Sequence, residues 1–189
     1  MPLNRFSLAT LPITPWKNGG GSTREIVSWP EGAADFEWRF SIATIDSSGP
    51  FSSFPDIERT IVLLDGGGVQ LRSDDGKIDH RLDRPLRPFR FDGALPLQAT
   101  LLDGASTDFN VMTRRALVRA QVELASAVSA LPPMDRGLLY AAKGSWAIDA
   151  CGPLAQGEGV WWDGTAQSMR AVPTSPGSAL LVVRLKAAA

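Results

Sequence analysis

Short segments of alternating apolar and polar residues recur along the chain, and a glycine or proline turn ends most of them. In the clearest segment, 117–124, Val118, Ala120, Val122 and Leu124 alternate with Arg119, Gln121 and Glu123. In segment 35–45, Trp38, Phe40 and Ile42 alternate with Arg39, Ser41 and Ala43. A period of two residues predicts a β-strand. One polar face on such a strand indicates an antiparallel sheet.

The spacing of these segments predicts an all-β fold. We expect further strands at 59–64, 69–72, 77–82, 97–102, 137–142, 145–149, 159–162, 168–172 and 179–186. Pro85 and Pro88 make the segment around them an edge strand or a loop. The one helix candidate, 55–59, is too short to count. Regular short strands with Gly/Pro turns favour a sandwich or barrel, and we expect two similar units, 1–112 and 113–189.

Composition and charge exclude several classes of protein. The formal net charge is −1 and the pI is about 5.8, so no basic footprint predicts a nucleic-acid partner. No apolar run is long enough to cross a bilayer, and the first residues lack the layout of a signal peptide. The single cysteine, Cys151, fits a reducing compartment. We therefore expect a cytoplasmic protein without a membrane partner.

Residues 14–26 hold the densest group of polar residues beside glycine. Gly19, Gly20 and Gly21 leave the backbone free to adopt a positive φ and to approach other groups closely. Trp16, Lys17 and Asn18 precede these glycines, and Thr23 and Arg24 follow them. Such a stretch is typical either of a binding loop or of a plain β-turn with hydrated neighbours.

Arginines in strand-like contexts are the other candidates for binding. Arg39 shares a strand face with Ser41, Arg59 opens an apolar strand, and Arg114 follows Asn110. Inside a small barrel a guanidinium must be paired, and its fork suits a carboxylate. The partner is either a ligand or an internal acid, for which the candidates are Glu25, Asp56, Glu58 and Asp108. Four aromatic residues either wall a pocket or fill the core, namely Trp16, Phe51, Phe54 and Phe109.

Catalytic and metal-binding motifs are scarce. With one histidine and one cysteine, the chain cannot supply the ligands of a usual transition-metal site. His80 is expected on an exposed hairpin strand. The sequence contains no Gly-x-Ser-x-Gly motif and no phosphate-binding loop. We therefore expect neither a metal nor another cofactor.

Four segments in order resemble the HutD/Ves family. They are Thr14–Ile26, Trp38–Ala43, Gly49–Pro55 with Arg59, and Asp108–Arg115. The second half is similar only in length and strand character. The resemblance implies a bicupin, with two cupin-like β-barrels in one chain. Metal-dependent cupins carry a histidine-rich motif that this sequence lacks.

The resemblance also implies a function. Family members are regarded as small-ligand-binding or regulatory proteins, and urocanate or a formylated glutamate intermediate of histidine utilisation is the suggested ligand. Stand-alone members are associated with stress. The pocket candidates carried over by position are Trp16, Lys17, Asn18, Arg24, Arg39, Ser41, Phe51, Arg59, Asn110 and Arg114.

Three hypotheses follow, in descending order. The first is a sensor of a small anionic metabolite. The second is a metal-independent enzyme acting on a small carboxylate, amide or sugar acid, in which Lys17, Glu25 or Asp108 serves as general acid or base. The third is a protein–protein module, with a homodimer as one form, in which Trp146, Trp161 and Trp162 mark the interface.

Overall fold

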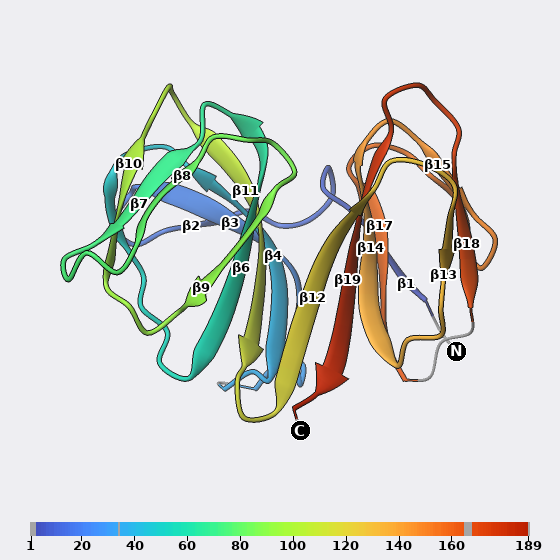
Figure 1. Ribbon diagram of the computed structural model, residues 1–189, viewed down its shortest axis with the longest axis horizontal. Helices are drawn as coiled ribbons and strands as arrows, with labels where there is room; N and C mark the ends of the chain where they lie inside the picture. Colours follow the sequence, from blue (N-terminus) through green and yellow to red (C-terminus); the bar gives the residue numbers. More distant parts are fainter. Residues whose placement is uncertain (1–2, 34, 165–167, 189) are drawn as a thin grey trace. The chain divides into compact units, whose positions relative to one another are not determined.

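Antiparallel strands make up the regular structure of this chain. The computed structural model describes residues 3–33, 35–164 and 168–188, which form nineteen strands and no helix (Figure 1). The expected all-β fold is confirmed. The helix candidate at 55–59 instead enters strand β6 (Ile57–Gly66). Among the described residues, no helix exists that could span a membrane.

The described chain separates into two compact units. The N-terminal unit is Pro12–Val118 with Ala188, and the C-terminal unit joins residues 3–11 to Arg119–Ala187. The expected division into 1–112 and 113–189 instead assigns residues 3–11 to the N-terminal unit. The difference arises because strand β1 (Asn4–Ser7) pairs with strand β17 (Glu158–Asp163).

Two antiparallel sheets form the N-terminal unit. The larger sheet has the order β2-β3-β4-β11-β6-β9, with β2 (Thr14–Pro15), β3 (Gly21–Trp29), β4 (Trp38–Ile45), β11 (Ser106–Arg114) and β9 (Pro88–Asp92) beside β6. The smaller sheet has the order β5-β10-β7-β8, with β5 (Gly49–Phe51), β10 (Leu97–Leu101), β7 (Val69–Ser73) and β8 (Asp79–Leu82). Ile61 and Leu63 of one sheet share a buried cluster with Val69 and Leu71 of the other. The apolar core therefore lies between the two sheets.

Proline and glycine fix the edges and turns of this unit. Pro88 opens β9, which is an edge strand as expected, since proline cannot donate a ladder hydrogen bond. Gly68 has a φ of +83°, and a Cβ there would lie 2.1 Å from the Leu82 carbonyl oxygen. Only glycine fits this turn between β6 and β7.

Alternation gives β4 two different faces. Trp38, Phe40 and Ile42 are at most 2% exposed, whereas Arg39 and Ser41 project from the opposite face. The strand prediction for 35–45 is confirmed in this respect. On β12 (Val118–Ala125) the pattern is less regular, because Leu124, expected on the apolar face, is 44% exposed.

The C-terminal unit is a second pair of sheets. One has the order β1-β17-β14-β19-β12, with β14 (Arg136–Lys143) and β19 (Ala179–Ala187) at its centre. The other has the order β13-β18-β15-β16, with β13 (Ser129–Leu131), β18 (Met169–Pro173), β15 (Trp146–Ile148) and β16 (Gly152–Leu154). Trp146 and Trp162 are fully buried in the core of this unit. These two therefore do not mark an interface, whereas Trp161, the third tryptophan of that hypothesis, is only partly buried.

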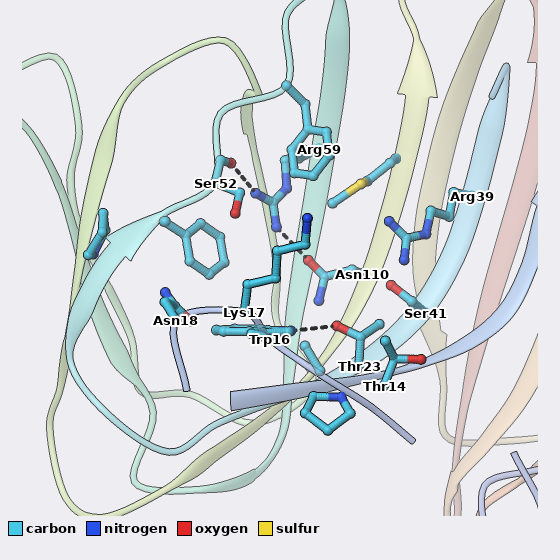
Figure 2. A pocket seen from close by; sticks show the side chains of 16 residues that line it. Thr14, Trp16, Lys17, Asn18, Thr23, Arg39, Ser41, Ser52, Arg59 and Asn110 are labelled. Atoms are coloured by element: carbon cyan, nitrogen blue, oxygen red, sulfur yellow. Dashed lines mark hydrogen bonds between the residues drawn. The ribbon is translucent and has the colours of Figure 1, made fainter. Parts of the chain in front are cut away.

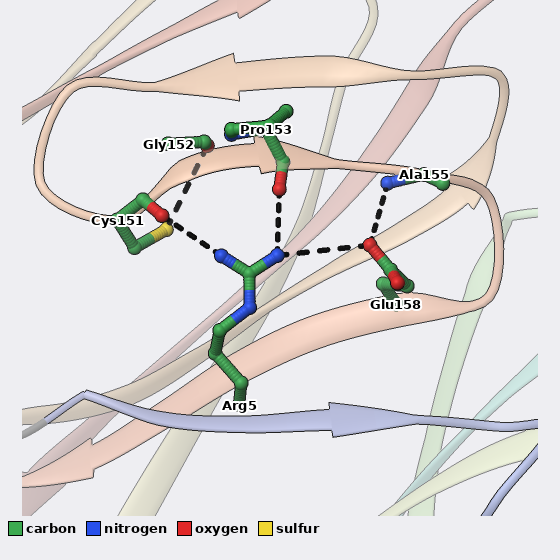
Figure 3. Close-up of polar contacts among 6 residues, drawn as sticks. All are labelled: Arg5, Cys151, Gly152, Pro153, Ala155 and Glu158. Atoms are coloured by element: carbon green, nitrogen blue, oxygen red, sulfur yellow. Dashed lines mark hydrogen bonds and ion pairs between the residues drawn. The ribbon is translucent and has the colours of Figure 1, made fainter.

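Arg5 ties the N-terminal strand to the C-terminal unit. Its terminal nitrogens donate to the carbonyl oxygens of Cys151 at 2.8 Å and Pro153 at 2.7 Å (Figure 3). Glu158 lies 3.7 Å from the same guanidinium. One side chain thus connects β1, β17 and the turn that leads into β16.

Candidate ligand-binding site

A cavity of about 520 Å³ opens between the sheets of the N-terminal unit (Figure 2). Its lining residues are Thr14, Pro15, Trp16, Lys17, Asn18, Thr23, Arg39, Ser41, Ala43, Pro50, Phe51, Ser52, Phe54, Arg59, Asn110 and Met112. Its size is that of a typical small-molecule site. No acidic side chain is among these residues, so the lining is cationic.

Strand register places the polar groups in two rows across the larger sheet. Met112 of β11 pairs with Arg39 on one side and Arg59 on the other. Asn110, two residues earlier and therefore on the same face, pairs with Ser41. Three adjacent strands thus deliver two guanidiniums, a hydroxyl and an amide to one wall.

Arg59 is the most unusual of these groups. It is 4% exposed, and the rings of Phe51, Phe54 and Phe91 lie within 5.4 Å of its guanidinium carbon. Its terminal nitrogens donate to the Ser52 carbonyl oxygen at 3.2 Å and to Asn110 Oδ1 at 2.9 Å (Figure 2). Within the described residues, no carboxylate lies in ion-pair range of it.

The environment of Arg59 disfavours its positive charge. Burial, and next the charge of Arg39, lower the pKa of Arg59 from its ordinary value to about 9. Each terminal nitrogen retains one N–H beyond those bound to Ser52 and Asn110. A carboxylate entering the cavity would accept these N–H groups and offset the buried charge.

Arg39 differs because it has an internal partner. Its Nε lies 2.7 Å from Glu25 Oε2. The Nε–H does not reach hydrogen-bond geometry, so the contact is an ion pair. Among the internal acids considered from the sequence, Glu25 thus pairs with Arg39, and Glu58 lies 3.6 Å from Arg90.

The glycine-rich segment forms the rim of the cavity. Trp16 Nε1 donates to Thr23 Oγ1 at 2.8 Å, and the Asn18 side chain accepts the Gly20 N–H at 3.1 Å. Lys17 and Asn18 are exposed at this rim. No acid within the described chain lies in ion-pair range of Lys17. The indole of Trp16 faces the cavity and supplies an aromatic wall, together with Phe51 and Phe54.

Asp108 is a second buried ionisable group on β11. It has no exposed surface and shares the inward parity of Asn110, opposite Ala43 of β4. Ser106 Oγ lies 3.2 Å from both carboxyl oxygens. Burial raises the pKa of Asp108 to about 7, against the opposing effect of the Ser106 hydrogen bond.

The cavity brings together eight of the ten residues expected from the sequence: Trp16, Lys17, Asn18, Arg39, Ser41, Phe51, Arg59 and Asn110. Arg24 and Arg114 do not line it. Arg24 lies on β3 between Thr23 and Glu25, so its side chain leaves the opposite face. Arg114, at the end of β11, donates to the Phe36 carbonyl oxygen and approaches Asp35.

Other cavity residues were not expected from the sequence. Thr23, Ser52 and Met112 line it, whereas Phe109, a proposed wall residue, is buried on the opposite face of β11. Strand alternation predicts this difference, because Phe109 and Met112 are three residues apart and therefore point to opposite faces of β11. His80 lies on β8, away from the cavity, and stacks on Phe89 with 3.6 Å between ring centroids.

The lining does not fit the metal ion of metal-dependent cupins. The described residues contain no group of three or more His, Cys, Asp or Glu side chains placed to hold a metal ion. In the cavity, the positions that face Asn110 and Met112 carry Ser41, Arg39 and Arg59. Two guanidiniums repel a divalent cation and attract an anion.

Comparison with known proteins identifies the family of this chain. The HutD family profile matches residues 8–180. The chain belongs to the HutD family. It is 39% identical to protein Ves of Cronobacter sakazakii over 166 residues, which cover 87% of this chain and 90% of that protein. It is 38% identical to protein Ves of Escherichia fergusonii, with 84% and 83% covered.

Solved structures support the assignment to the HutD family. HutD from Pseudomonas fluorescens SBW25, in a formate condition, superposes with a TM-score of 0.86 at 28% identity over 98% of this chain and 99% of that one. A conserved protein of unknown function from Pseudomonas aeruginosa PAO1 gives 0.85 at 32% identity, with the same coverage. Oxalate decarboxylase from Lactobacillus farciminis shares the fold alone, with a TM-score of 0.67 at 9% identity over 98% and 86% of the two chains. The fold is the expected bicupin.

Proposed function

We propose that this HutD-family protein binds a small carboxylate in the cavity of its N-terminal unit and has a regulatory role in the cytosol. The main support for the proposal is the burial of Arg59 without a carboxylate partner among the described residues. A buried guanidinium without an internal carboxylate is costly to the folded protein, and a ligand carboxylate offsets that cost. Asn110 and Ser52 hold this guanidinium in place.

The cavity also favours a ligand with a flat body. Trp16, Phe51 and Phe54 offer aromatic surface beside Arg59. Urocanate is planar and carries one carboxylate, and a formylated glutamate intermediate is the second candidate. Formate, which is named in the condition of the Pseudomonas fluorescens HutD structure, is the smallest carboxylate. The aromatic surface beside Arg59 supports a small planar carboxylate such as urocanate.

Thermal unfolding with a panel of acids tests the proposal. The panel is urocanate, histidine, glutamate, formylglutamate, formiminoglutamate and formate. We expect one acid to raise the apparent stability by about 2.7 kcal/mol at a hundredfold excess over its Kd. The shift should disappear in Arg59→Ala and persist in Arg90→Ala, which alters an exposed arginine on β9.

A lysine variant keeps the test informative if Arg59→Ala does not fold. Arg59→Lys keeps the charge and loses the two-pronged geometry, so its affinity should fall at least tenfold. A panel in which no acid shifts the unfolding temperature would refute the proposal. So would an equal shift in both Arg59 variants and the wild type.

A metal-independent enzyme is the second candidate function. Lys17 faces the cavity without an acidic partner in the described chain. Asp108 is a buried acid with a pKa of about 7, but it does not line the cavity. Glu25 is less suited as a base because it pairs with Arg39. Conversion of a bound acid, followed by NMR and abolished in Lys17→Met, would favour the enzyme over the sensor.

A further inference from the structure

The two arginines of the cavity occupy equivalent positions but differ in their partners. Arg39 and Arg59 flank Met112 on neighbouring strands. Arg59 is buried, and in the described chain it meets only a carbonyl oxygen, an amide oxygen and aromatic rings. Arg39 already meets the carboxylate of Glu25 at 2.7 Å. The cavity therefore contains one neutralised guanidinium and one that lacks a counter-ion.

The course of β3 brings Glu25 to Arg39. Glu25 pairs with Ser41, which places it diagonally from Arg39 and within reach of a long side chain. A β-bulge follows directly, between Glu25 and Val27, and shifts the register so that Ser28 pairs with Arg39. Bulges of this kind re-aim side chains beside binding sites.

The exposure of this ion pair limits its value to the fold. The Glu25 side chain is 47% exposed and that of Arg39 is 23% exposed. Ion pairs with this much solvent contact add little to stability. The charge of Arg39 still acts on a ligand, since Arg39 lines the cavity.

We propose that Glu25 is a specificity-determining residue that acts as the internal counter-ion of Arg39 and restricts the cavity to ligands with a single carboxylate. Of the two candidate ligands, this favours urocanate over formylglutamate, which carries two carboxylates. This inference rests on the proposed carboxylate site. The ligand's carboxylate meets Arg59, and its far end meets a neutral Glu25–Arg39 pair. A second carboxylate there would compete with Glu25 and repel it.

Two probes of the same flat shape isolate the effect of one charge. Fumarate carries two carboxylates, and fumaramate carries one carboxylate and one amide. Calorimetry on the full chain should give the wild type a Kd for fumaramate at least as low as that for fumarate. In Glu25→Gln, the affinity for fumarate relative to fumaramate should rise about tenfold, since Arg39 is released for the second carboxylate.

Two further variants serve as controls. Asp79→Asn removes one negative charge from an exposed hairpin pair with Arg72, outside the cavity, and should keep the wild-type ratio. Glu25→Asp keeps the charge and should retain the preference for fumaramate. An unchanged ratio of fumarate to fumaramate affinity in Glu25→Gln, or an equal change in Asp79→Asn, would overturn the role of Glu25. The carboxylate site itself would stand. If the wild type binds an acid of the thermal-unfolding panel but neither probe, this inference is overturned and the carboxylate site stands. If it binds no acid at all, both are overturned.

Discussion

Buried charge is concentrated in two residues of the N-terminal unit, and both are on the inward face of the larger sheet. Arg59 is held by neutral partners, and Asp108 by one hydroxyl. Neither has an opposite charge that would compensate its burial within the described residues. Groups of this kind are unfavourable for stability and are concentrated at functional sites.

Asp108 predicts a distinctive dependence of stability on pH. Its pKa is about 7 in the folded protein and near 3.8 when unfolded, so the folded state holds the proton more tightly. The free energy of unfolding should therefore fall as pH rises from 4 to 7, by up to about 4 kcal/mol from this group. Asp108→Asn should flatten that slope in urea unfolding at pH 5 and pH 8.

An exposed carboxylate provides the control for Asp108. Asp46→Asn should reproduce the wild-type profile, because Asp46 lies on the surface. A slope that is the same in Asp108→Asn and in the wild type would contradict the assignment of the pH dependence to Asp108.

Strands differ in how well the sequence predicts them. Segments in which large apolar residues alternate with polar or small ones, such as 35–45, are predicted by that alternation. The central strand β11 was interpreted only as a motif, because its inward residues include Asp108 and Asn110. In β11 the apolar Phe109 and Val111 lie on the face opposite the cavity, and the polar Asp108 and Asn110 lie inside the unit.

The sequence predicts which residues form the site better than it predicts the contacts among them. Residues of all four motifs converge on the cavity, because β3, β4, β11 and β6 are neighbours in the larger sheet and β5 belongs to the smaller sheet of the same unit. The partner of each arginine was not predictable, since pairing depends on strand register and on a β-bulge in β3. Arg24 was misplaced for the same reason, as the glycine-rich segment continues into a strand with two faces.

The start of β3 depends on a close approach that only glycine permits. A Cβ on Gly21 would lie 2.2 Å from the Thr44 carbonyl oxygen and 3.1 Å from the Trp16 ring. Gly21→Ala should therefore lower the free energy of unfolding by about 1–3 kcal/mol, as in other overpacked sites. It should also weaken ligand binding by displacing Trp16.

Gly49 is the matched control for that substitution. A Cβ at Gly49, which opens β5, meets no atom within 4 Å. Gly49→Ala should change the free energy of unfolding by less than about 0.5 kcal/mol in the same urea titration. Equal effects of the two substitutions would show that crowding at Gly21 is not the cause.

At the scale of the whole molecule, the first and the last strand, β1 and β19, belong to the same unit. Strand β1 supplies an edge of the sheet that also contains β19. The N-terminal unit is formed almost entirely by the intervening residues, Pro12–Val118. The cavity lies wholly within that unit, so the N-terminal strand contributes stability to the C-terminal unit and no residue to the site.

Arg5 provides a test of this arrangement. Arg5→Ala removes two hydrogen bonds from a half-exposed guanidinium and should cost about 1 kcal/mol. Hydrogen exchange should accelerate at the amides of β1 and β17 and remain unchanged in β4 and β11. Arg170→Ala, which alters an exposed position on β18, should leave both sets unchanged. Faster exchange confined to the N-terminal unit would contradict the prediction.

The pairing of β1 with β17 also has a consequence for synthesis on the ribosome. Asn4 and its partner Trp161 are 157 positions apart. At ordinary elongation rates, β1 waits roughly 8 to 30 seconds before its partner strand is made. During that time the residues between them emerge and can fold first. The exposed Asn4 and Arg5 keep the waiting segment hydrated, which protects it from pairing with the wrong strand.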